Sequence, residues 1–171
     1  MIPLSARYWQ LAALLAALLP QYDRLPLWLS ALVLLACLWR LPAVERRLAA
    51  PGNAVRVLIL IAGLAGVVLS HRTVFGPEGG VSFLILCAAL KLLETRDRRD
   101  VFVLTVLDLF MLATAFLFSQ SLLLTVYVGC ALVVIVAALV ALQQRDGVSS
   151  RRTLGRAALL VGQAVPLMLV L

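Results

Sequence analysis

Long apolar stretches separated by short polar connections dominate this chain. They cover residues 8–19, 25–39, 55–69, 81–93, 101–118, 122–142 and 157–171. None of them alternates apolar and polar residues, as the strands of a membrane β-barrel do. The backbone of a segment in lipid must satisfy its own hydrogen bonds, so helices are the remaining structure. The pattern therefore predicts an all-α fold, a polytopic membrane helix bundle of about six to seven helices.

The stretches differ in length when they are compared with a bilayer. A hydrocarbon core of about 30 Å needs roughly 20 helical residues. The fifth and sixth stretches reach that length, whereas the first four must borrow flanking residues or cross a thin region of membrane. The first two could instead form a tight hairpin that does not fully cross. The stretch at 8–19 ends without the small residues of a signal-peptide cleavage site, so we expect an uncleaved first helix.

The composition indicates that these helices are surrounded by lipid and not by water. Of the 171 residues, 64% are hydrophobic and 13% are charged, whereas soluble domains have about 45–50% and about 25%. A small domain buries only about two-thirds of the surface that its unfolded chain exposes. These values exclude a soluble enzyme, a disordered tail and a disulfide-stapled secreted domain. We expect a single transmembrane domain over residues 1–171, with the lipid bilayer as its partner.

The basic residues sort to one side of the membrane if seven crossings are assumed. Thirteen of the 15 fall at the N-terminus and in alternate connections, and only Arg24 and Arg72 fall on the other side. The positive-inside rule then places the N-terminus in the cytoplasm and sends the last helix out of it. The net charge of +7 is explained by orientation signals, so no nucleic-acid partner is expected. If the first two stretches form a hairpin that does not cross, two crossings are lost together and the last helix still leaves the cytoplasm.

Residues that could hold a metal or a cofactor are few. Cys37, Cys87 and Cys130 lie in separate apolar stretches without a C-x-x-C pair, and we expect them to be small packing residues. His71 is the only histidine, so the chain cannot supply both axial ligands of a b-type haem. No catalytic residue, metal or cofactor is expected within these residues.

Asp108 is the acidic residue that lies deepest in an apolar stretch. It lies about eight residues, or roughly 12 Å, into the stretch at 101–118. A carboxylate at that depth costs several kcal/mol unless it is paired, protonated or hydrated. An antiparallel hairpin brings the preceding helix close, so we expect an ion pair between Asp108 and Lys91. A protonated or hydrated acid and a transport pathway are the alternatives.

A second set of candidates lies where the fourth stretch meets the fifth. Lys91 and Glu94 stand three residues apart near the expected membrane interface, where a lysine can extend its amine to water. Residues 96–100 mix three arginines, among them Arg98 and Arg99, with two aspartates. This mixture indicates a charge-locked turn that sets orientation. The alternative is a contact with anionic lipid headgroups or a cytoplasmic partner.

The polar connection before the sixth stretch supplies one more candidate, Gln120. It lies between Ser119 and Ser121, in a sequence typical of a tight turn whose serines cap the following helix. We therefore expect a structural role for this segment.

Four short motifs follow one another along the chain: LPLW at 25–28, FGPEGG at 75–80, LKLLETRDRRD at 90–100 and FLFSQSL at 116–122. Their order and spacing resemble the N-terminal membrane region of bacterial transglutaminase-like membrane proteins, the protein-glutamine gamma-glutamyltransferase family. In that family a helix bundle precedes a large periplasmic transglutaminase-like domain and a last membrane helix. The resemblance implies a multi-pass protein of the bacterial inner membrane. Asp108 departs from the family pattern, where a small or apolar residue is expected.

The resemblance also implies that the family's catalytic Cys, His and Asp lie beyond Leu171. The chain is still apolar at Leu171, so we expect a fragment of a longer protein whose periplasmic domain follows. The expected function is to anchor, with regulation as a further role, a periplasmic acyltransferase domain that is also its partner. The alternative is a small stand-alone membrane transporter or channel that uses Asp108 and Lys91. An intramembrane enzyme lacks the acid pair or metal set it needs, and the oligomeric state stays open.

Overall fold

The computed structural model describes residues 4–41, 52–71, 76–95, 97–118, 121–143 and 150–170. In these ranges the chain forms seven α-helices and no strand, which confirms the prediction of an all-α fold. The α-helices are α1 (Leu4–Leu18), α2 (Leu27–Trp39), α4 (Asn53–His71), α5 (Pro77–Glu94), α6 (Arg98–Thr114), α7 (Leu122–Gln143) and α8 (Ser150–Val170). Two 3-10 helices, η1 (Leu19–Arg24) and η2 (Ala115–Leu117), continue α1 and α6.

Among the residues that the structure describes, three helical segments are long and apolar enough to cross a membrane: Asn53–Ser70, Arg98–Leu117 and Leu122–Gln143. Two of them match the stretches that the sequence predicted to be long enough. The third is α4, which gains its length from flanking residues because the helix starts at Asn53, ahead of its apolar stretch. The apolar helix α2 has only 13 residues, so it is short for a span of about 30 Å.

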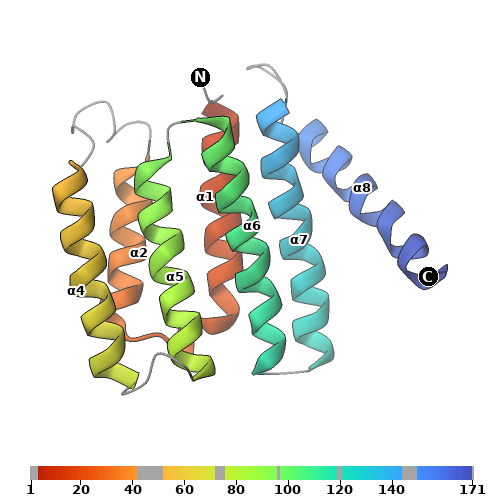
Figure 1. The fold of residues 1–171 in the computed structure, drawn as a ribbon. Helices are drawn as coiled ribbons and strands as arrows, with labels where there is room; N and C mark the ends of the chain where they lie inside the picture. The colour runs from red at the N-terminus through yellow and green to blue at the C-terminus, as the bar shows by residue number, and fades with distance from the viewer. Residues whose placement is uncertain are drawn as a thin grey trace.

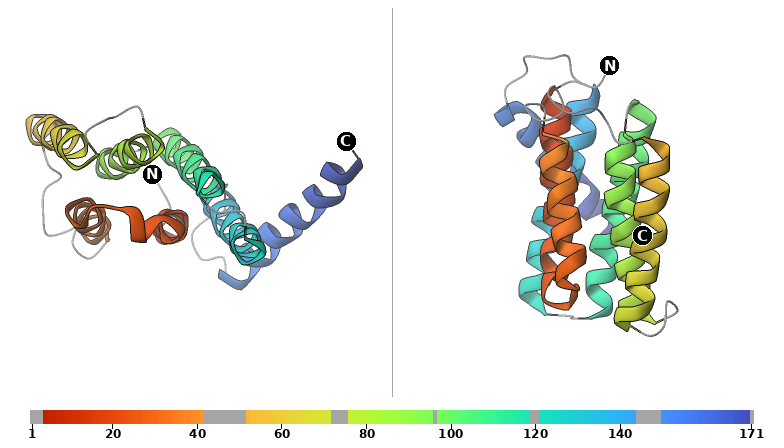
Figure 2. Two further views of the ribbon diagram at one scale, coloured as in Figure 1. Left: turned by 90° about the horizontal axis from the view of Figure 1, so that it is seen from below. Right: turned by 90° about the vertical axis from the view of Figure 1, so that its left-hand side faces the viewer.

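Successive helices run in opposite directions, so the connections alternate between two ends of the molecule (Figure 1). The helices α4, α5 and α6 form one layer, and the pair of α1 and α2 lies against it (Figure 2). There α2 packs on α5, while α1 packs on both α6 and α7. Helix α8 contacts α7 and points away from the other helices (Figure 1). Helix α1 therefore packs against both α6 and α7, which also contact each other.

One end of the molecule collects the starts of α1, α4, α6 and α8 (Figure 1). Each of these helices carries arginine in its first two turns, namely Arg7, Arg56, Arg98 and Arg152. Because the helices alternate in direction, residues far apart in the sequence gather at this end. We call it the basic end.

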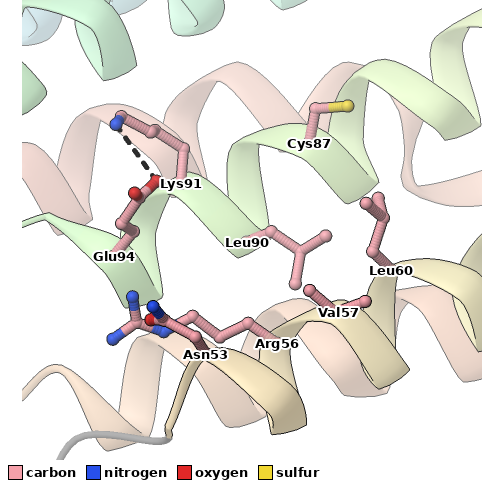
Figure 3. Close-up of a pocket in the computed structure, with 8 residues that line it drawn as sticks. All are labelled: Asn53, Arg56, Val57, Leu60, Cys87, Leu90, Lys91 and Glu94. Atoms are coloured by element: carbon pink, nitrogen blue, oxygen red, sulfur yellow. Dashed lines mark hydrogen bonds and ion pairs between the residues drawn. The ribbon is translucent and has the colours of Figure 1, made fainter.

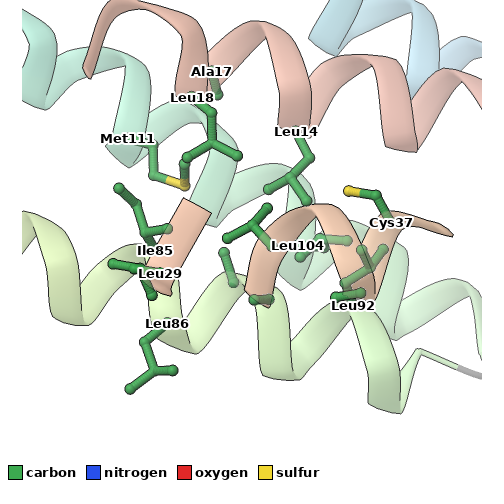
Figure 4. Close-up of a cluster of buried hydrophobic side chains, with 14 of the residues drawn as sticks. Leu14, Ala17, Leu18, Leu29, Cys37, Ile85, Leu86, Leu92, Leu104 and Met111 are labelled. Atoms are coloured by element: carbon green, nitrogen blue, oxygen red, sulfur yellow. The ribbon is translucent and has the colours of Figure 1, made fainter. Parts of the chain in front are cut away.

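The main apolar core lies between α1, α2, α5 and α6 (Figure 4). Its largest fully buried side chains are Leu14, Leu29, Ile85, Leu86, Leu104 and Met111. A second cluster joins α1, α6 and α7 through Ala13, Leu112 and Ile135, together with the alanines Ala131 and Ala138 of α7. Small residues let helix backbones approach closely, and in lipid that contact is a main source of helix association.

Two glycines of α4 permit its close contact with the neighbouring helices. A Cβ atom on Gly66 would lie 3.0 Å from the Trp28 ring of α2, and one on Gly63 would lie 2.6 Å from the Leu86 side chain of α5. The Trp28 indole also donates a hydrogen bond of 3.2 Å to Ser70 Oγ. A side chain on Gly66 therefore requires the rigid Trp28 ring to shift by a few tenths of an ångström.

We predict that Gly66→Val destabilises the protein by about 1–3 kcal/mol, because a branched side chain forces the Trp28 ring to move. The matched control is Gly129→Val in α7, where nothing lies within 4 Å of an added Cβ. Thermal unfolding in detergent measures both variants. An equal loss of stability in the two variants would show that helix propensity, and not the Trp28 contact, sets the effect.

Candidate functional site

The buried polar side chains of α1 and α6 meet around Asp108. Gln10 of α1 donates a hydrogen bond of 2.7 Å from Nε2 to Asp108 Oδ2. The Oε1 atom of Gln10 accepts a hydrogen bond of 3.2 Å from Thr105 Oγ1. Asp108, Thr105 and Gln10 are 0%, 1% and 3% exposed. These three residues, which we call the Asp108 cluster, form a closed polar unit between the helices.

The positions along the helices explain why these side chains meet. Thr105 and Asp108 lie three residues apart on α6, which places them on one face about one turn apart. The single hydroxyl proton of Thr105 is shared between Gln10 Oε1 and the Val101 carbonyl oxygen, which lies 2.9 Å from Oγ1. The second carboxyl oxygen, Asp108 Oδ1, is buried and has no hydrogen-bond partner in the described part of the chain. The cluster therefore holds the acid by one strong donor.

The predicted ion pair between Lys91 and Asp108 is wrong. Lys91 Nζ instead lies 2.9 Å from Asp100 Oδ1 and 3.2 Å from Glu94 Oε2. The helix pair α5 and α6 is antiparallel as expected, but α1 lies against the face of α6 that carries Asp108. Gln10 therefore reaches the carboxylate, whereas the lysine amine reaches acids at the basic end.

A second glutamine of the first apolar region ties the opposite end of α1 to α6. The Nε2 atom of Gln21, in η1, lies 2.6 Å from the Met111 carbonyl oxygen and 2.9 Å from Thr114 Oγ1. The sequence reasoning overlooked both Gln10 and Gln21. A signal was present, since they are 11 residues apart, or about three helical turns, and so project from one face.

Lys91 and its acids connect α5 to the start of α6. Asp100 accepts the lysine amine and also a hydrogen bond of 3.1 Å from the Asp97 backbone N–H, as in a capping box. The side chain of Arg40 donates to the Thr95 carbonyl oxygen at the same connection. This is the arrangement of a charge-locked turn, because Asp100 both caps α6 and pairs with Lys91 of α5.

Arg98 and Arg99 lie in the first turn of α6 and are exposed. Gln120 and Ser119 lie outside the described residues. The neighbouring Ser121 accepts a hydrogen bond of 3.2 Å from the Leu124 N–H and so caps α7, as the sequence predicted for this turn. The predicted polar candidates therefore do not converge on one centre.

An open groove of about 430 Å³ lies between α4 and α5 at the basic end (Figure 3). Its walls include Lys91 and Glu94 of α5 and Asn53 and Arg56 of α4. The Asp108 cluster is enclosed between α1 and α6. The two residues of the transporter hypothesis, Lys91 and Asp108, thus belong to different places in the fold.

The potential metal ligands of the described residues are dispersed. No group of three or more His, Cys, Asp or Glu side chains in these residues could hold a metal ion. The cysteines are free thiols on three different helices, with Cys37 buried, Cys87 half-buried and Cys130 exposed. The buried acid bound to an amide holds α1 and α6 together, and the charge-locked turn fixes the connection between α5 and α6.

Comparison with known proteins gives a consistent result over almost the whole chain. The family described as the TgpA N-terminal domain matches residues 9–171. A protein of Pseudomonas aeruginosa named protein-glutamine gamma-glutamyltransferase is 36% identical over 172 aligned residues, which include 99% of this chain. The chain spans 26% of the length of that relative. No solved structure matches this fold significantly.

We predict that a double-mutant cycle between Gln10 and Asp108 gives a coupling energy of about 1 kcal/mol or more, as expected for a hydrogen bond to a buried acid. The variants are Gln10→Leu, Asp108→Leu and the pair, and chemical unfolding in detergent gives the free energies. A parallel cycle with Lys91→Gln and Asp108→Leu is expected to show coupling below about 0.5 kcal/mol. The opposite ranking would restore the Lys91–Asp108 pair.

Proposed function

This chain belongs to the family of the TgpA N-terminal domain, and we propose that it is a multi-pass inner-membrane domain that anchors a periplasmic transglutaminase-like domain. The observation that carries the proposal is the alternation of helix directions together with the collection of arginines at the basic end (Figure 1). A chain that enters lipid repeatedly needs both features if its topology is to be unique.

The outer surface supports a lipid environment. Large apolar side chains are exposed on several helices, with Leu27, Leu69 and Leu122 each more than 80% exposed. Only 11% of the segment Asn53–Ser70 of α4 is buried inside the protein. In water such a surface would drive aggregation, whereas hydrocarbon chains solvate it without cost. The buried amides of Gln10 and Gln21 correspondingly donate to groups of α6.

The arrangement of the ends supports one orientation. If the basic end faces the cytoplasm, the chain begins there with α1. The described helices α2, α4, α5, α6 and α7 then alternate in direction, so that α8 runs from the cytoplasmic side towards the periplasm. A domain that follows this helix is delivered outside the cytoplasm. The proposed periplasmic domain fits that direction.

The enzymatic part of the proposal comes from the relative. Its name, protein-glutamine gamma-glutamyltransferase, describes transfer of the γ-glutamyl acyl group from a protein glutamine side chain, and this chain spans only 26% of its length. Transglutaminase-like domains carry out such chemistry with a Cys nucleophile that a His activates. We propose that this machinery belongs to the following domain and that these helices fix its position above the membrane, with regulation as a further role.

We predict that alkaline phosphatase is active when it is fused after Phe118 or after Leu171 and inactive when it is fused after Gln143. The enzyme folds only outside the cytoplasm. Phe118 lies at the end opposite the basic end, Leu171 follows α8, and Gln143 lies at the basic end. Green fluorescent protein at the same points should give the reverse pattern and controls for expression. Phosphatase activity after Gln143 would contradict the orientation.

A further inference from the structure

The groove between α4 and α5 has a polar end and an apolar length. Asn53, Arg56, Lys91 and Glu94 lie towards the basic end, and Val57, Leu60, Cys87 and Leu90 form the remaining walls (Figure 3). Its volume of about 430 Å³ is in the range of small-ligand sites. Because the groove is open and α4 is barely buried, its apolar part is continuous with the outer surface of the helices.

The two cations of the groove differ in how they are neutralised. Lys91 is held by Glu94 and by Asp100, so its charge is balanced within the protein. Arg56 has no such partner among the described residues, and its buried Nε atom makes no hydrogen bond there. Figure 3 shows the Arg56 side chain extended towards Asn53, so that guanidinium and amide converge on one end of the groove. The two cations and the two acids around this end sum to zero, but Arg56 is the cation that contacts no acid among the described residues.

The apolar walls lie next to the end of the groove that carries Arg56 and Asn53. Leu90 of α5 points across the groove towards Val57 and Leu60 of α4 (Figure 3). A ligand that fills the groove therefore needs an anionic group at one end and a hydrocarbon chain at the other. A soluble anion satisfies only the first requirement, and a neutral hydrocarbon satisfies only the second.

We propose that this groove binds an anionic phospholipid, with the phosphate on Arg56 and Asn53 and an acyl chain along Val57, Leu60 and Leu90. A guanidinium donates two parallel hydrogen bonds to phosphate oxygens, which suits Arg56 for this role. The inference rests on the proposed membrane location. With the basic end in the cytoplasm, the groove opens to the cytoplasmic leaflet, whose anionic lipids attract basic residues.

The test measures lipid retained by the purified chain in detergent, using native mass spectrometry with added phosphatidylglycerol. Arg56→Gln is expected to lower retention about fivefold, the equivalent of the ~1 kcal/mol that one basic residue contributes near a membrane surface. Arg99→Gln is the matched control, because it removes an exposed arginine from the same end. Equal losses in both variants would overturn the site in favour of general charge attraction.

A second pair of variants leaves every charge in place. Leu60→Trp places a larger side chain in the apolar part of the groove and is expected to lower phosphatidylglycerol retention. Leu58→Trp changes an exposed residue of α4 outside the groove walls and is expected to leave retention unchanged. Size-exclusion chromatography checks that each variant stays folded. No difference between the tryptophan variants would overturn the acyl-chain contact.

Two further probes identify the source of the anion. Phosphatidylcholine, which carries no net charge, is expected to be retained less than phosphatidylglycerol, and inorganic phosphate should not compete at equal concentration. Equal retention of the two lipids, or displacement by phosphate, would overturn the proposal. The fusion reporters test the orientation independently of this lipid measurement, so failure of the site and failure of the proposed topology are distinguishable.

Discussion

The contact between α1 and α6 determines how the rest of the molecule is arranged. Asp108 is fully buried on α6, and an acid in that position needs a donor that does not expose it to water. Gln10 supplies that donor from α1 at 2.7 Å. Gln21 makes the corresponding contact with the Met111 carbonyl oxygen at the other end. Two polar contacts, about three turns apart, therefore fix the register of α1 on α6.

Around that contact, small residues allow close helix approach and large residues fill the apolar core. Ala13, Ala131 and Ala138 let α1 approach α7 closely, while Leu14, Leu104 and Met111 fill the space towards α2 and α5. In water the burial of apolar area would drive this packing. In lipid the outside is as apolar as the inside, so close contact and internal hydrogen bonds must supply the specificity. This is why a few buried amides have a large effect on the fold.

The charged residues gather at the basic end, apart from the buried Asp108, because the helices alternate in direction. Lys91, Asp100 and the Arg40 contact to the α5–α6 connection all lie at the basic end, where they join neighbouring helices through their ends. Arg56 lies at the same end, but its position in the groove leaves its charge without a partner in the described residues. The proposed orientation and the proposed lipid site therefore both depend on cations at the basic end.

The sequence by itself determined the helical class, the approximate helix ranges and the sorting of basic residues, because these depend on local composition and on the order of segments. The cap at Ser121 followed from the same local chemistry. The partner of Asp108 was decided only by the tertiary structure. Sequence neighbours favoured Lys91, but the face of α6 that carries the acid meets α1, which precedes it by some 98 residues. No local pattern contains that choice, because it depends on which of several apolar helices packs on which face.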